Sequence, residues 1–193
     1  MIMKLLKTFV FLGLLLISQW AHSDYPKTEA DFMLLPPYCK ARKEGRGPNY
    51  DLWQKRFGPN FLHMHHYCSG LHSINLARKT FDHKLKSHIL ETAIKEMETV
   101  QHEFSPDFMM QTKIYYDLGN IYEIQERNND AMLAYQQSIR LNPKLAFSYS
   151  ALSDLYKKQN KIAEAIEILK QGLKYKPDSK SLKKHLEKLT KGK

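Results

Sequence analysis

Residues 112–145 read TKIYYDLGNIYEIQERNNDAMLAYQQSIRLNPKL, and residues 146–179, which follow directly, read AFSYSALSDLYKKQNKIAEAIEILKQGLKYKPDS. Five positions carry the same residue in both segments at a spacing of 34: Tyr115 and Tyr149, Leu118 and Leu152, Tyr122 and Tyr156, Ala131 and Ala165, Pro143 and Pro177. A fixed period of this length is typical of chains built from stacked helical units.

Within each segment the apolar residues recur at the spacing of one helix face. Tyr115, Leu118 and Tyr122 lie three and four residues apart, so their side chains share one side of a helix. Gly119 and Ala131 are small, which allows two antiparallel helices to approach closely. We expect four helices in the two segments, over residues 112–126, 129–142, 146–159 and 162–175.

Turn-forming residues separate these helices. Asn128 and Asn129 interrupt the apolar pattern of the first segment, and either can cap the helix that follows. Asn160 stands at the corresponding turn of the second segment. Pro143 ends the first unit, because proline lacks the N–H that a continuing helix requires.

The two segments resemble the tetratricopeptide repeat, whose pattern is a large aromatic residue, Leu-Gly, Tyr, a small residue, a large apolar residue and a closing Pro. The second segment differs from the first in having Ser153 in place of Gly119 and Leu169 in place of Tyr135. The resemblance implies an all-α fold: a short α-solenoid of helix-turn-helix pairs, with repeats at residues 112–145 and 146–179.

About three units are usually needed to stabilise such a solenoid, so the chain upstream should supply another helical layer. Residues 61–106 predict a divergent helix pair, with helices over residues 61–81 and 86–104 and Pro106 behind them. The second of these helices carries apolar residues at helical spacing: Leu90, Ile94, Met97 and Val100.

The first 23 residues predict export. Lys4 and Lys7 precede an apolar run, and Ala21 and Ser23 close the segment, which is the pattern of a secretory signal peptide. An uncleaved membrane anchor is the alternative, although the apolar run is short for a span of roughly 20 residues. We expect an exported protein, periplasmic or released outside the cell.

Residues 24–60 predict an irregular N-terminal cap. Proline and glycine break any long helix here, and Trp53 and Phe57 allow one short helix between the breaks. An oxidising compartment favours a disulfide between the two cysteines of the chain, Cys39 and Cys68.

Positive charge is concentrated at the C-terminal end. The chain has a formal net charge of +10, and residues 157–193 contribute +8 of it, while residues 24–156 are neutral. Residues 180–193 predict a capping helix that Asp178 or Ser179 can cap, with leucines on one side and lysines elsewhere. This tail can hold an anionic membrane surface, or it can be a solvated face. An exported protein is not expected to bind nucleic acid.

One cluster has ligand chemistry: His63, His65, His66 and His72, with Cys68 among them. Imidazole and thiolate at helical spacing can bind zinc or copper, so a metal-binding envelope protein is an alternative function. A disulfide at Cys68 would remove the thiolate, however. The imidazoles can instead pack under the cap and donate hydrogen bonds to loop carbonyls. We therefore predict no metal and no cofactor.

The function predicted from these features is protein–protein interaction. The sequence lacks the G-x-S-x-G, H-E-x-x-H, C-x-x-C-H and phosphate-loop motifs, so we do not expect an enzyme. The resemblance implies an adaptor that binds a peptide or protein partner on the concave face lined by the first helix of each repeat, with Asn120 contacting the peptide backbone. The candidate groove residues are Lys113, Tyr116, Asn120, Phe147, Asp154 and Lys157. They can equally be solvated positions without a ligand.

Overall fold

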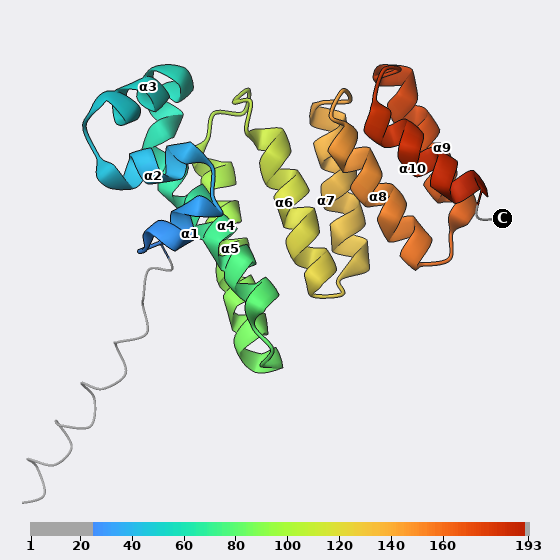
Figure 1. The fold of residues 1–193 in the computed structure, drawn as a ribbon, viewed down its shortest axis with the longest axis horizontal. Helices are drawn as coiled ribbons and strands as arrows, with labels where there is room; N and C mark the ends of the chain where they lie inside the picture. Colours follow the sequence, from blue (N-terminus) through green and yellow to red (C-terminus); the bar gives the residue numbers. More distant parts are fainter. Residues whose placement is uncertain (1–24, 192–193) are drawn as a thin grey trace, which may run out of the picture.

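The structure is a computed structural model that describes residues 25–191, and every regular element in that range is helical. The N-terminal part contains α1 (Glu29–Met33), α2 (Pro37–Glu44), α3 (Pro48–Phe57) and the 3₁₀ helix η1 (Gly58–His63). The helices α4 (Met64–Lys79), α5 (His83–Glu103), α6 (Gln111–Ile124), α7 (Asn128–Leu141), α8 (Ala146–Lys158), α9 (Ile162–Tyr175) and α10 (Lys180–Lys191) follow. They stack side by side in chain order (Figure 1). The expected all-α solenoid is confirmed.

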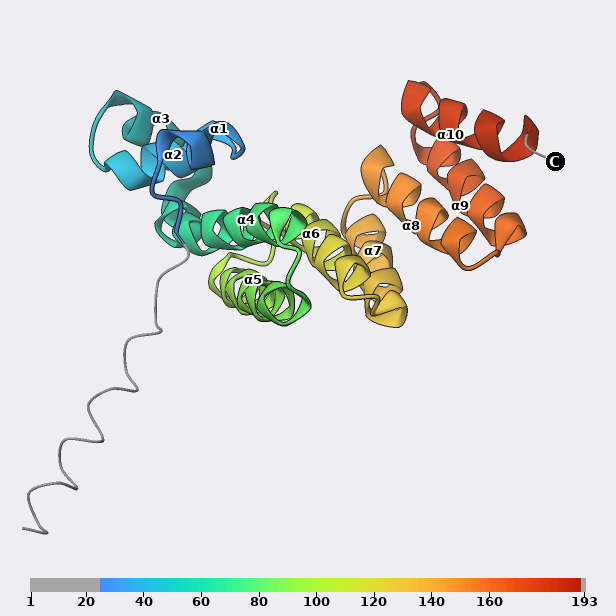
Figure 2. The same ribbon diagram turned by 60° about the horizontal axis from the view of Figure 1, so that its bottom comes forward.

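The two sequence repeats form two antiparallel helix pairs, α6 with α7 and α8 with α9 (Figure 2). Each expected helix is present, with ends that differ from the expected ones by no more than two residues. The small residues lie where the helices approach most closely. A Cβ atom built on Gly119 would lie 2.4 Å from Cε1 of Tyr135, so the first pair cannot accept a larger side chain without moving the buried tyrosine ring.

The turn of the first repeat differs from the expected one. The residue before α7 is Arg127, and no side chain caps the helix, so the prediction that Asn128 or Asn129 acts as the cap is wrong. Both asparagines lie inside the helix, and Glu126 takes the left-handed conformation of the turn, with φ of 59°. In the second repeat Asn160 adopts the same conformation, with φ of 60°, at the expected turn.

The helix α10 closes the C-terminal end. The hydroxyl of Ser179 accepts a hydrogen bond from the N–H of Leu182 at 3.4 Å, which confirms Ser179 as a cap. Leu182 is fully buried, and Leu186 and Leu189 pack against the same core cluster. The lysines of this helix therefore lie on its outer side.

The upstream helix pair, α4 and α5, supplies the expected third layer. The helix expected over residues 61–81 is divided into η1 and α4, and the helix expected over residues 86–104 begins earlier, at His83. Asp82 explains the earlier start, because its carboxylate accepts a hydrogen bond from the N–H of Leu85 at 2.6 Å and caps α5.

The segment before η1 holds three short helices where the sequence indicated one. Pro36 precedes α2, whose first residue is Pro37, and the glycines at 45, 47 and 58 separate α2, α3 and η1. A disulfide joins Cys39 of α2 to Cys68 of α4, and both residues are fully buried. Tyr38 packs edge-on against Trp53 and Phe57, with ring centroids 5.3 Å apart in each pair. The disulfide and the aromatic contacts fasten the short helices to α4.

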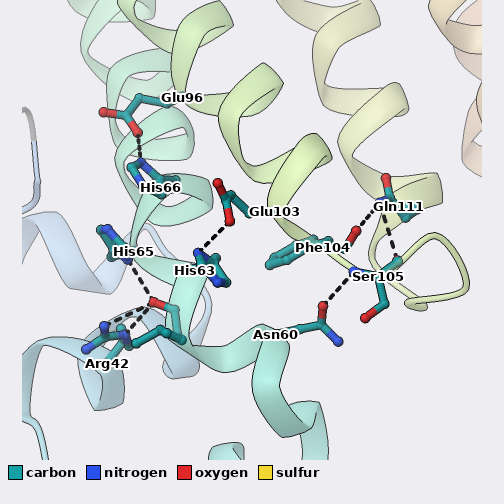
Figure 3. Close-up of polar contacts among 11 residues, drawn as sticks. Arg42, Asn60, His63, His65, His66, Glu96, Glu103, Phe104, Ser105 and Gln111 are labelled. Atoms are coloured by element: carbon teal, nitrogen blue, oxygen red, sulfur yellow. Dashed lines mark hydrogen bonds and ion pairs between the residues drawn. The ribbon is translucent and has the colours of Figure 1, made fainter.

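Polar contacts join the N-terminal part to the first repeat and to the connection that precedes it. The hydroxyl of Tyr67 in α4 donates to the Asp117 carboxylate in α6 at 2.7 Å. Burial raises the pKa of Asp117, and the neighbouring Lys113 ammonium opposes that shift. In addition, the side-chain oxygen of Asn60 accepts from the N–H of Ser105 at 2.8 Å, and the side-chain amide of Gln111 donates to backbone carbonyls at the end of α5 and just after it (Figure 3).

The predicted signal peptide, residues 1–23, lies outside the described residues. Within residues 25–191, no helix has both the length and the apolar character needed to cross a bilayer.

Candidate functional site

A groove of about 850 Å³ lies along the first helices of the two repeats and the capping helix. Its walls come from α6, α8 and α10, and residues from α7 and the connecting turns complete them. The lining residues include Tyr116, Asn120, Glu123, Tyr135, Phe147 and Lys176.

Five of the six candidate groove residues line this groove: Tyr116, Asn120, Phe147, Asp154 and Lys157. The sixth, Lys113, does not line it. Its ammonium pairs with the Asp117 carboxylate at 2.5 Å and lies 5.0 Å from the ring centroid of Tyr116. Lys113 therefore contacts the Tyr116 side chain of the groove wall while its charge is paired with Asp117.

Two aromatic rings form the apolar part of the groove. Phe147 of α8 packs edge-on against Tyr116 of α6, with ring centroids 4.5 Å apart. Phe147 is only half-buried and is not part of the core face that Tyr149 and Leu152 form. The pair bridges two successive repeats and leaves aromatic surface open to the groove.

Polar groups form the adjacent part of the wall. The hydroxyl of Tyr135 lies 3.0 Å from Oδ1 of Asn120 and 2.9 Å from Oε2 of Glu123. Burial and the Glu123 carboxylate raise the pKa of Tyr135, so its hydroxyl stays protonated and donates. Lys158 of α8 pairs with Glu123, which links the two repeats. The orientation of Asn120 is therefore fixed by contacts within the protein.

The groove also contains basic side chains. Lys157, Lys176 and His185 line it, together with the acidic Glu123 and Asp154. Lys157 and Lys176 are exposed, and within residues 25–191 neither forms an ion pair. The groove thus combines aromatic surface with two unpaired lysines.

The histidine cluster lies away from the groove, between α4 and α5. Nδ1 of His66 lies 2.7 Å from the Glu96 carboxylate, and Nδ1 of His63 lies 3.5 Å from that of Glu103 (Figure 3). Both acidic partners come from α5, and Glu96 follows His66 by 30 residues in the sequence. The His66 contact joins α4 to α5, and the His63 contact joins η1 to α5.

His65 lies beside His66, with ring centroids 4.1 Å apart, and contacts the backbone. Its Nδ1 lies 2.9 Å from the carbonyl oxygen of Leu62, which the guanidinium of Arg42 also contacts at 3.0 Å. Since a carbonyl oxygen only accepts hydrogen bonds, Nδ1 carries the proton. Burial lowers the pKa of His65, and the hydrogen bond to Leu62 partly opposes that shift. His72 is buried in the same helix.

The cluster does not have the geometry of a metal site. Among residues 25–191, no three His, Cys, Asp or Glu side chains are placed to hold a metal ion. Cys68 is bonded to Cys39, and His63 and His66 face carboxylates on α5. The observed contacts are hydrogen bonds and ion pairs that hold helices together.

Comparisons with known proteins agree with this architecture. The tetratricopeptide repeat pattern matches residues 112–145 and 148–179. The fold is similar to the crystal structure of a thermophilic tetratricopeptide-repeat protein of Thermus thermophilus, with a TM-score of 0.61, 19% sequence identity and coverage of 79% of each chain. A comparison with curated protein sequences found no match.

Residues 112–145 and 148–179 are therefore tetratricopeptide repeats, and these repeats indicate a module for protein–protein interaction.

Proposed function

We propose that this chain is an exported adaptor that binds an extended or helical segment of a partner protein in the groove along α6, α8 and α10. The observation that carries the proposal is the bridge between repeats, where the half-buried ring of Phe147 meets Tyr116. Aromatic side chains at the centre of a recognition surface supply most of the binding energy in many interfaces.

The polar wall supports the same proposal. The Asn120 amide lies in the groove wall beside the Tyr135 hydroxyl, and it can hydrogen-bond the backbone of a bound segment. Its contact with Tyr135 restricts the side chain before binding, so the new contact requires little additional ordering.

Export is part of the proposal and rests on the first 23 residues. Their charged start, apolar middle and small residues at the end are those of a secretory signal. The buried Cys39–Cys68 disulfide supports it, since structural disulfides persist in oxidising compartments. Of the exported locations, we favour the periplasm.

Replacing Tyr116 and Phe147 together with Ala should lower the affinity for the partner by about thirtyfold or more. The test is affinity capture from the compartment where the protein accumulates, followed by titration of the captured partner. Leu133→Ala is the matched control, because Leu133 is 61% exposed on α7 and lies outside the groove. Equal affinities of the groove variant and the wild type would refute the proposed site.

A further inference from the structure

The connection between α4 and α5 projects from the molecule. These two helices are longer than their counterparts in the repeats, with 16 and 21 residues against 13 or 14. As a result their connection extends beyond the α6–α7 and α8–α9 turns on the same side of the solenoid (Figure 1). We call residues 78–86 the hairpin tip.

The hairpin tip exposes two large apolar side chains. Phe81 is 95% exposed, the highest value among the exposed large apolar residues of the described chain, and Leu85 is 52% exposed. Both residues belong to the segment around the start of α5, where the Asp82 carboxylate caps the helix. The cap orders the backbone around Phe81, so its exposure is a property of a structured turn.

Positive charges surround these apolar side chains. Arg78, Lys79, Lys84 and Lys86 lie in the hairpin tip, against the single carboxylate of Asp82. Within residues 25–191 none of the four cations forms an ion pair. Lys79 and Lys84 are exposed and available to an external anionic surface, whereas Lys86 is half-buried.

We infer that the hairpin tip is a contact site for an anionic lipid bilayer. A projecting aromatic side chain can enter the interface between headgroups and acyl chains, as aromatic residues do at membrane surfaces. The lysines can keep their ammonium groups at the headgroups while their aliphatic stems lie along the apolar layer. No described helix is long and apolar enough to span the bilayer, so the contact is peripheral.

The C-terminal lysines are not accompanied by an exposed apolar side chain. Lys183, Lys184 and Lys188 of α10 are exposed, but Leu182, Leu186 and Leu189 of the same helix face the protein core. Such a face can attract anionic lipid without inserting an apolar group. Because α10 lies at the other end of the solenoid from the hairpin tip (Figures 1 and 2), the two surfaces can be tested separately.

The first test measures cosedimentation with vesicles of phosphatidylcholine, with and without phosphatidylglycerol. The protein is purified in the form that the producing cell accumulates, and residues 1–24 are the same in every variant. We expect binding only to the anionic vesicles. Phe81→Ser should weaken it about tenfold, and Lys79→Gln with Lys84→Gln about thirtyfold.

Matched controls remove equivalent groups elsewhere. Leu133→Ser removes an exposed leucine from α7, and Lys183→Gln with Lys184→Gln removes two charges from α10. Each control should change vesicle affinity by less than about threefold, because charges far from the bilayer are screened. Equal losses in tip variants and controls, or the absence of binding to anionic vesicles, would overturn the inference.

A second readout locates the contact. The described chain has no free cysteine, so an environment-sensitive fluorophore can be placed on His83→Cys in the tip and, separately, on Lys188→Cys in α10. We expect a blue shift on anionic vesicles only for the label at position 83. A shift confined to position 188, or binding without any shift at position 83, would contradict the assignment even if residues 1–24 held the protein on the vesicles.

Discussion

Replacing Gly119 with Ser should lower the free energy of unfolding by about 2–3 kcal/mol, near the upper end of the range for added atoms in a filled core. A Cβ atom at this position would lie 2.4 Å from the ring of Tyr135, which is fully buried. The ring cannot easily move aside, because its hydroxyl is hydrogen-bonded to Asn120 and Glu123. Ser has a better helix propensity than Gly, but the difference is smaller than the packing cost.

The second repeat suggests the compensating change. It has Ser153 where the first repeat has Gly119, and Leu169 where the first has Tyr135. Gly119→Ser combined with Tyr135→Leu should therefore be more stable than the sum of the two single changes predicts, by about 1 kcal/mol or more. Urea unfolding of the four proteins measures this coupling. Additive losses would show that the Gly119 and Tyr135 contact does not determine how α6 approaches α7.

Removing the disulfide by replacing Cys39 and Cys68 with Ala should lower the free energy of unfolding by about 3–4 kcal/mol. The bond closes a loop whose ends are 29 residues apart, so the unfolded chain without it gains conformational freedom. The expected loss is a large part of the roughly 5–15 kcal/mol that stabilises a typical domain. Denaturant unfolding of both proteins under non-reducing conditions measures the difference.

Chemical reduction supplies the control for this prediction. The wild type unfolded and refolded with a reducing agent should match the Ala variant, whereas the variant itself should not respond to the reducing agent. The denatured wild type can also be treated with an alkylating agent without prior reduction. If two thiols react, the disulfide is absent, and the stability that we assign to it is contradicted.

The 34-residue period was sufficient to predict the repeat region. Tyr115, Leu118 and Tyr122 share a helix face at a spacing that no other regular structure reproduces, and the closing prolines mark where each unit ends. The turn was less predictable, because the left-handed residue is Glu126 and not one of the neighbouring asparagines. Asparagine is a preferred helix cap, so the pattern favoured Asn128 or Asn129 as the cap of α7, whereas both lie inside the helix.

The N-terminal part was harder to predict because its stabilising contacts are distant in sequence. Short helices such as α1 and α2 have little hydrophobic periodicity of their own and depend on tertiary contacts. Likewise, nothing near His66 in the sequence indicates its partner, since Glu96 comes from the next helix. The histidines therefore suggested metal ligation, although the folded chain pairs two of them with carboxylates.

The groove could be predicted in part. Phe147 had no place on the core face of its helix, and the structure puts it beside Tyr116 in the groove. Tyr135 and Glu123 were missed because Tyr135 belongs to the core pattern, which gives no sign that its hydroxyl reaches the groove wall. Tyr135 could have been identified as a core tyrosine whose ring packs against a glycine, Gly119, of the neighbouring helix.

The groove and the hairpin tip belong to different helices. The groove depends on α6, α8 and α10, whereas the hairpin tip connects α4 and α5. Variants at either surface should therefore leave the other one unchanged, and partner binding can be measured without interference from lipid binding.

Site-specific photocrosslinking tests the central claim most directly. A photoreactive amino acid is placed at Phe147 in the groove or at Leu133 on α7, and the producing cells are irradiated. Binding in the groove predicts a discrete crosslinked partner from position 147 that disappears when Tyr116 is replaced with Ala and is absent from position 133. The same adducts from both positions, or none from position 147, would contradict the claim that the groove is the binding surface.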